Sequence, residues 1–245
     1  MFSNPRKKPL GFSNLSNNNV EKNFKDEKYK AIKLFDDKKF DDAYISFRDL
    51  LKRNHNDPQL YIFIGIIEAM KENYKNAIKN LTKAKEIDNK IPEIFFNLGK
   101  IYNNLDNIEL SIFNYKKSIE VDSYYYLSYQ NLILILFKEG KFDEAKLIIE
   151  KGLKIMPEEP VLNYNYALVL SKLNEFNKAK NQFNRLLLLT PNNVGLKINF
   201  GHLLSEMHLF DDAKIQFEDA LKLEPHSPSL HLSYSELLFR MEQYE

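Results

Sequence analysis

Small side chains recur every 34 residues along most of this chain, and this spacing is the feature that most limits its possible folds. The recurring residues are Ala43, Ala77, Ser111, Ala145, Ala179 and Ala213, with no insertion or deletion between them. A large apolar residue lies three positions before each one, from Phe40 to Phe210, and another lies four positions after, from Phe47 to Phe217. A fixed period of this length indicates an array of stacked structural repeats.

A second column of mostly small residues lies twelve positions before the first, and it indicates that each repeat is a pair of helices. Its members are Ala31, Gly65, Gly99, Ile133, Ala167 and Gly201. Apolar residues within a unit follow helical spacing, as in Leu98, Ile101, Tyr102 and Leu105. Small residues on two antiparallel helices allow close approach, and large residues one turn away fill the remaining groove. The sequence therefore predicts an all-α fold, an α-solenoid of antiparallel helix hairpins that must stack to complete their cores.

Proline and acidic residues predict where the helices begin. Pro58, Pro92, Pro160 and Pro228 fall at the expected start of the first helix of a unit, where a backbone N–H is not needed. Acidic pairs such as Asp41 and Asp42 open the expected second helices, where carboxylates interact favourably with the helix dipole. We therefore interpret these carboxylates as structural and not as catalytic groups.

The combined pattern resembles the tetratricopeptide repeat family over residues 24–245. The residues that match the family pattern in the third unit are Phe95, Leu98, Gly99, Tyr102, Ser111, Tyr115 and Ser118, and those in the sixth are Phe200, Gly201, Leu204, Ala213, Phe217, Ala220 and Pro225. Ile133 replaces a small residue, and Glu27, Asn163 and Lys197 replace the early aromatic residue. We expect these departures to change local packing only. The resemblance implies a right-handed superhelix and a protein-binding role.

The expected units are residues 24–57, 58–91, 92–125, 126–159, 160–193 and 194–227, with a partial unit at 228–245. Residues 1–23 are rich in Asn, Ser and Lys, and we expect a disordered tail there. The basic run at residues 5–9 is either part of a solubilising tail or a nuclear-import or acidic-surface contact. The chain ends where a second helix would begin, so we expect further chain after Glu245.

The resemblance places the first helix of each hairpin along a concave groove, with the second, fifth, sixth, ninth, twelfth and thirteenth residues of a unit facing inward. The sixth position carries Asn97, Asn131, Asn165 and Asn199 in four consecutive units. An amide offers a donor and an acceptor, so such a ladder can pair with the backbone of an extended peptide. The alternative is that Asn is simply frequent in this chain and common at this position.

The fifth and ninth positions add a largely apolar surface with scattered polar groups, typical of protein contacts. The candidate groove residues there are Phe96, Lys100, Gln130, Leu134, Tyr164, Leu168, Ile198 and His202. The alternative is that some of them pack against the adjacent repeat. The family's clamp for a C-terminal carboxylate is not matched, because Lys100 stands where Asn is needed and Gly195 where Lys is needed. The run from Tyr124 to Tyr126 is a further candidate contact, or a cover for neighbouring helix ends.

The composition argues against most other classes of function. Lys and Arg number 35 against 34 Asp and Glu, so the charge gives no reason to expect a nucleic acid partner. The chain has no Cys, its five His show no i, i+4 metal pair, and no phosphate-binding or nucleophile motif occurs. No apolar stretch is long enough for a membrane span and no signal peptide is visible, so we expect a cytoplasmic protein.

We therefore predict no catalytic residue, no metal site and no cofactor, and a protein or peptide as the partner. Two function classes remain. The first is a scaffold that binds an extended peptide or partner segment in its groove. The second is the substrate-recruiting part of a larger enzyme, similar to repeat-bearing glycosyltransferases or sulfotransferases, with its catalytic part beyond Glu245.

Overall fold

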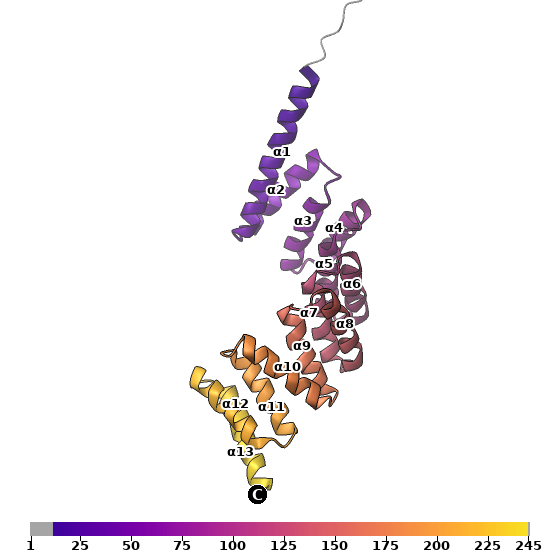
Figure 1. Cartoon of the computed structure of the whole chain (residues 1–245). Helices are drawn as coiled ribbons and strands as arrows, with labels where there is room; N and C mark the ends of the chain where they lie inside the picture. Colours follow the sequence, from indigo (N-terminus) through magenta and orange to yellow (C-terminus); the bar gives the residue numbers. More distant parts are fainter. Residues whose placement is uncertain (1–11, 245) are drawn as a thin grey trace, which may run out of the picture. The chain divides into compact units, whose positions relative to one another are not determined.

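The computed structural model describes residues 12–244, and within them every regular element is an α-helix (Figure 1). The helices are α1 (Phe12–Asp36), α2 (Phe40–Arg53), α3 (Pro58–Met70), α4 (Tyr74–Ile87), α5 (Pro92–Asn104), α6 (Ile108–Val121), α7 (Tyr126–Lys138), α8 (Phe142–Ile155), α9 (Pro160–Lys172), α10 (Phe176–Leu189), α11 (Val194–Glu206), α12 (Phe210–Leu223) and α13 (Pro228–Tyr244). The predicted all-α solenoid of consecutive hairpins is confirmed. The chain forms two compact units, Met1–Ser111 and Ile112–Glu245, which we describe separately.

The helices start where the sequence predicts. Proline occupies the first position of α3, α5, α9 and α13. Side chains also cap some of these starts, since the Asp57 carboxylate accepts a hydrogen bond from the Gln59 N–H at 3.0 Å. Asn193 Oδ1 likewise accepts from the Leu196 N–H at 2.9 Å. Each bond satisfies a backbone donor that has no partner inside the helix.

The turn inside each hairpin contains one residue in the left-handed backbone region. These residues are Lys38, Glu72, Asp106, Gly140, Asn174 and His208, with φ between 54° and 67°. They lie 34 residues apart, so the turn is built in the same way six times. Only one of them is glycine, although glycine alone adopts this conformation without a steric cost. The other five turns therefore store a small backbone strain.

The two predicted columns form the core. All six small residues from Ala43 to Ala213 are 0% exposed, and the large column from Phe47 to Phe217 is 0–1% exposed. Ser111, the one polar member, donates its hydroxyl to the Gly99 carbonyl at 2.8 Å, so its burial leaves no unmet hydrogen bond. Ile133 is 1% exposed, so the core accommodates this larger side chain in the column of small residues. The predicted register is confirmed.

Each hairpin completes its core against its neighbours. In the first unit, α3 packs against both α2 and α4 and also contacts α5. In the second unit, the first helices of successive hairpins contact one another in the order α7, α9, α11 and α13. A buried cluster from Ala167 to Leu237 joins α9 through α13. This arrangement lines up one face of each first helix with the same face of the next.

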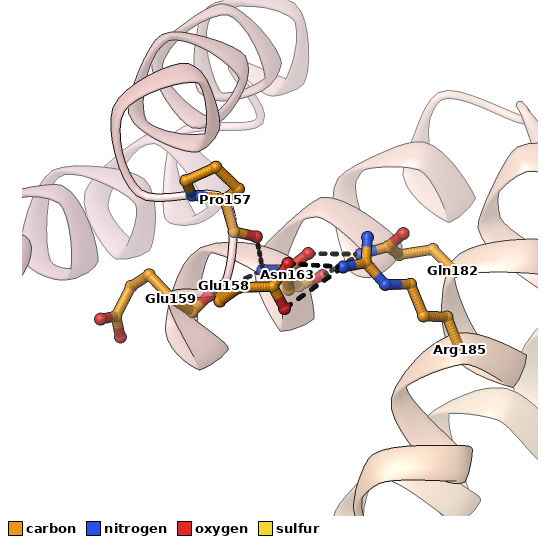
Figure 2. Close-up of polar contacts among 6 residues, drawn as sticks. All are labelled: Pro157, Glu158, Glu159, Asn163, Gln182 and Arg185. Carbon is orange, nitrogen blue, oxygen red and sulfur yellow. Dashed lines mark hydrogen bonds and ion pairs between the residues drawn. The ribbon is translucent and has the colours of Figure 1, made fainter.

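Polar groups replace the missing early aromatic residues. Asn163 is 6% exposed, and its amide donates to the Pro157 carbonyl at 2.7 Å and to the Glu159 carbonyl at 3.0 Å (Figure 2). The Gln182 amide donates to Asn163 Oδ1 at 2.8 Å. Glu27 is paired with Arg53 in the first unit. These bonds keep the buried or half-buried polar groups satisfied, which explains why the departures leave the fold intact.

Helix α1 begins at Phe12 and so extends into the segment that we predicted as a disordered tail. Residues 1–11, which include the basic run, lie outside the described residues. Phe24 of α1 packs against the core cluster of α1, α2 and α3.

Candidate functional site

The predicted groove residues all lie on the first helices of hairpins and none is buried. Phe96, Asn97 and Lys100 belong to α5 in the first unit, and the other nine belong to α7, α9 and α11 in the second. In α5, the Lys100 ammonium lies 5.7 Å from the centre of the Phe96 ring, a cation–π contact on the surface of the helix.

Each of the four asparagine side chains makes the same kind of hydrogen bond to its own helix. Each Nδ2 donates to the carbonyl four residues earlier on its own helix. The distances are 2.8 Å for Asn97, 2.9 Å for Asn131, 2.8 Å for Asn165 and 3.0 Å for Asn199. An amide has two N–H donors and an oxygen with two acceptor sites. In Asn131 and Asn165, one N–H and the oxygen therefore remain for a partner.

Asn199 differs from the other members of the ladder. Its Nδ2 also donates to the Tyr164 hydroxyl at 2.5 Å, which links α11 to α9. Both of its N–H groups are then used, so only its oxygen can meet a partner. Burial raises the pKa of Tyr164, while the bond from Asn199 opposes this shift. The Tyr164 hydroxyl keeps its own proton, and this O–H becomes the donor at this point of the surface.

The apolar candidates divide into two kinds. Leu134 is 69% exposed and Gln130 is also exposed, so both present their side chains to solvent. Tyr164, Leu168 and Ile198 are half-buried and pack against the core cluster of α9 to α13. The packing alternative left open by the sequence therefore applies to these three side chains, which support the core while keeping one edge on the surface.

A cavity of about 250 Å³ lies on the first-helix face of the second unit, between α9, α11 and α13. Three predicted residues line it, namely Leu168, Asn199 and His202. Sequence reasoning missed the rest of its polar lining: Ser171, Lys172, Ser205, Glu206, Ser233, Glu236 and Arg240. The sequence could have indicated five of these residues, because they occupy the twelfth and thirteenth positions of their units, which the resemblance places inward.

His202 is a half-buried titratable residue in the lining of this cavity. Its ring lies edge-on to the Phe217 ring, with 5.3 Å between the ring centres. Burial lowers the pKa of His202, and the nearby carboxylates of Glu236 and Glu206 oppose that shift. Arg240 and Lys172 lower the pKa further. The ring is therefore neutral at pH 7, and it can accept or donate a hydrogen bond without adding charge to the cavity.

A second hollow of about 310 Å³ lies beside Tyr164 and is lined mainly by apolar side chains. Val161, Leu186 and Leu196 line it together with the polar Asn163. At its edge, the Arg185 guanidinium donates to the Glu158 carboxylate at 3.0 Å (Figure 2). Nothing in the sequence marked this hollow, because it depends on how the end of α10 meets the joint before α11.

The tyrosine run at the joint before α7 is partly available. Tyr124 is 66% exposed and Tyr126 is 42% exposed, whereas Tyr129 is 0% exposed and belongs to the core.

Within residues 12–244, no three His, Asp or Glu side chains converge as a metal site would require. No helix in the same part is both long and apolar enough to cross a membrane.

Two tetratricopeptide repeat family models match the chain, one at residues 136–197 and one at residues 92–125. Comparison with curated protein sequences gives no match. Solved structures match with low identity. The structure of PilF from Pseudomonas aeruginosa has a TM-score of 0.70 at 18% identity, with 91% of this chain and 98% of that chain covered.

Two other structures match over shorter parts. YrrB, described as a TPR protein with an unusual peptide-binding site, has a TM-score of 0.64 at 15% identity, with 78% of this chain and 97% of that chain covered. A chain of the APC/C hetero-tetramer Cut9–Hcn1 has a TM-score of 0.63 at 16% identity. That match covers 86% of this chain but only 42% of the other. At these identities the likeness concerns the fold.

Proposed function

We propose that this chain, a tetratricopeptide repeat protein, is a scaffold that binds an extended segment of another protein. The binding surface is the face formed by the first helices of the second unit, from α7 to α13. The observation that carries the proposal is the polar cavity between α9, α11 and α13, whose lining includes positions that the family resemblance places inward. We also propose that the protein works in the cytoplasm.

The free amide groups on α7 and α9 support an extended peptide as the ligand. Asn131 and Asn165 each keep one N–H and an oxygen that their own helices do not use. A peptide backbone presents the same pair of groups at regular intervals, so it can be held without regard to its side chains. YrrB is a tetratricopeptide repeat protein described as having a peptide-binding site, which is consistent with this use of the fold.

The test is a pair of variants with the full chain as bait. Replacing Asn131 and Asn165 with Ala should weaken binding of a captured partner about tenfold, because two hydrogen bonds of about 0.5–1.5 kcal/mol are lost. The thermal melt should change little, since both side chains are only half-buried and the carbonyls that they cap are already bonded within the helix.

Asn181→Ala is the matched control, because Asn181 is exposed on α10, a second helix. A partner that is lost equally from the control and from the double variant would not be bound by the ladder. A large drop in melting temperature for the double variant would mean that the two asparagines are structural, and the proposal would fail.

A further inference from the structure

Three exposed charged residues form a row along the cavity. Lys172 ends α9, Glu206 ends α11 and Arg240 lies in the corresponding place on α13. They are 34 residues apart, so they occupy the same position in three successive repeats. All three line the cavity, and their signs alternate from one helix to the next.

These charges have no ion-pair partner among the described residues. Elsewhere in the second unit, charged side chains join neighbouring hairpins directly. Lys116 reaches Glu144 at 2.6 Å, and Lys146 reaches Glu175 at 2.5 Å. These four charges are therefore used within the fold, whereas the row on the first helices leaves its charges available to another molecule.

A second carboxylate lines the same cavity as the row. Glu236 lies one helical turn before Arg240 on α13. Its carboxylate and that of Glu206 both act on His202, so both acids lie near the same ring. A basic side chain placed here would meet two carboxylates. Acidic side chains on either side of it would meet Lys172 and Arg240.

The spacing of the helices sets the spacing of the ligand. Packed helices lie about 8–10 Å apart. An extended or polyproline-type chain advances about 3 Å per residue. A segment running along the row therefore moves from one helix to the next in about three residues. The complementary order is an acidic residue, two spacers, a basic residue, two spacers and an acidic residue.

We propose that the cavity between α9, α11 and α13 selects protein segments of the form acid-x-x-base-x-x-acid, by the row Lys172, Glu206 and Arg240 together with Glu236. This inference rests on the proposed function, since it names the chemistry of the segment bound by the same face. Specificity then comes from side-chain charge, while the asparagine amides hold the backbone.

The test compares two labelled peptides of equal composition and net charge by fluorescence anisotropy with the full chain. One contains Glu-x-x-Lys-x-x-Glu and the other Lys-x-x-Glu-x-x-Glu, in a Ser and Gly host. The first should bind about tenfold more tightly at low salt, because three partly exposed charge pairs are matched in it. The difference should shrink at 1 M salt, where the screening length is about 3 Å.

Charge reversal supplies the second arm. The variant with Lys172→Glu, Glu206→Lys and Arg240→Glu should lose the preference for the first peptide and bind Lys-x-x-Glu-x-x-Lys instead. Lys151→Glu is the control, because Lys151 is exposed on α8, a second helix, and should leave the preference unchanged. Matching far-UV circular dichroism melts will establish that the reversed variant is folded.

A selection from a random peptide library separates the two proposals. Selected peptides that lose binding with Asn131→Ala and Asn165→Ala but lack the charge order would overturn the charge preference and leave the scaffold function standing. Equal binding of the two designed peptides would overturn it as well. A library that yields no binder would count against the proposed function, and the charge preference would fail with it.

Discussion

The hydroxyl of Tyr129 is buried without a hydrogen-bond partner, and replacing this residue with Phe should stabilise the protein. The side chain is 0% exposed, and no described residue lies within hydrogen-bonding distance of its oxygen. Burying a hydroxyl that has lost its bonds to water costs about 1–3 kcal/mol. Phe has the same ring and lacks only the oxygen, so the substitution removes this cost from the folded state.

The gain is reduced by the small gap that the oxygen leaves. A few atom–atom contacts of about 0.1–0.2 kcal/mol each are lost, or roughly 0.5 kcal/mol together. The net stabilisation by Tyr129→Phe should therefore be about 0.5–2.5 kcal/mol. In a chain of this size, each kcal/mol moves the melting temperature by about 2–4 °C. Urea unfolding followed by circular dichroism measures the free energy, and a thermal melt checks its sign.

The same chemical change should have the opposite sign at Tyr44. Its hydroxyl donates to Glu68 Oε1 at 2.7 Å, and Glu68 is 7% exposed. Tyr44→Phe leaves a buried carboxylate with one donor fewer, which should cost about 1.5–3 kcal/mol. If Tyr129→Phe also destabilised the protein by more than about 0.5 kcal/mol, the Tyr129 hydroxyl would have a partner, such as a buried water, and the reasoning would be wrong.

Alkaline pH gives an independent check on Tyr129. Burial raises the pKa of this hydroxyl, and the nearby charge of Asp122 raises it further. An unfolded tyrosine ionises near pH 10, while the folded one keeps its proton to a higher pH. Stability from this group is therefore fully present below about pH 10 and is lost as the pH rises through the folded pKa. The free energy of unfolding of the Phe variant should therefore exceed that of the wild type by a growing amount between about pH 9 and 11, the range around the tyrosine pKa.

Three further substitutions test the packing and the turns. Ala145→Leu should overpack a hairpin at a site that is 0% exposed and cost about 1–3 kcal/mol by urea unfolding, so an unchanged midpoint would contradict the register. Glu72→Gly should stabilise the protein by up to about 1 kcal/mol, because it relieves the strain of a left-handed backbone at φ 61°. Gly140→Ala should destabilise it for the same reason. Equal unfolding midpoints for the variants and the wild type would show that the turns carry no strain. Asn163→Ala should cost about 1–3 kcal/mol, because the Gln182 amide loses its partner, and a neutral melt would mean that water replaces the side chain.

The candidate site could be predicted only in part. The register placed Leu168, Asn199 and His202 on one face, and all three line the cavity between α9, α11 and α13. The same register contained Lys172 and Arg240, which reading only the fifth, sixth and ninth positions left out. The apolar hollow beside Tyr164 had no signal in the sequence, because it depends on the meeting of a helix end with a joint.

The sequence by itself determined the repeat and its internal packing. Small and large residues in register, such as Ala145 and Ile149, specify which faces of the two helices meet, and every one of these contacts is local along the chain. Proline at the start of four helices marks the first helical residue, because its ring fixes φ and its missing N–H is not needed there. Such features can be read from spacing because each depends on residues within one hairpin or the next.

The tertiary structure decided what each surface side chain does. The Asn131 amide bonds to its own helix, Asn199 reaches across to Tyr164, and the charge of Lys172 stays unpaired among the described residues. These outcomes depend on distances between helices that are 34 residues apart in sequence and on the rotamer of each side chain. Differences of about 1 Å decide whether a hydrogen bond forms, and a repeat pattern does not contain them.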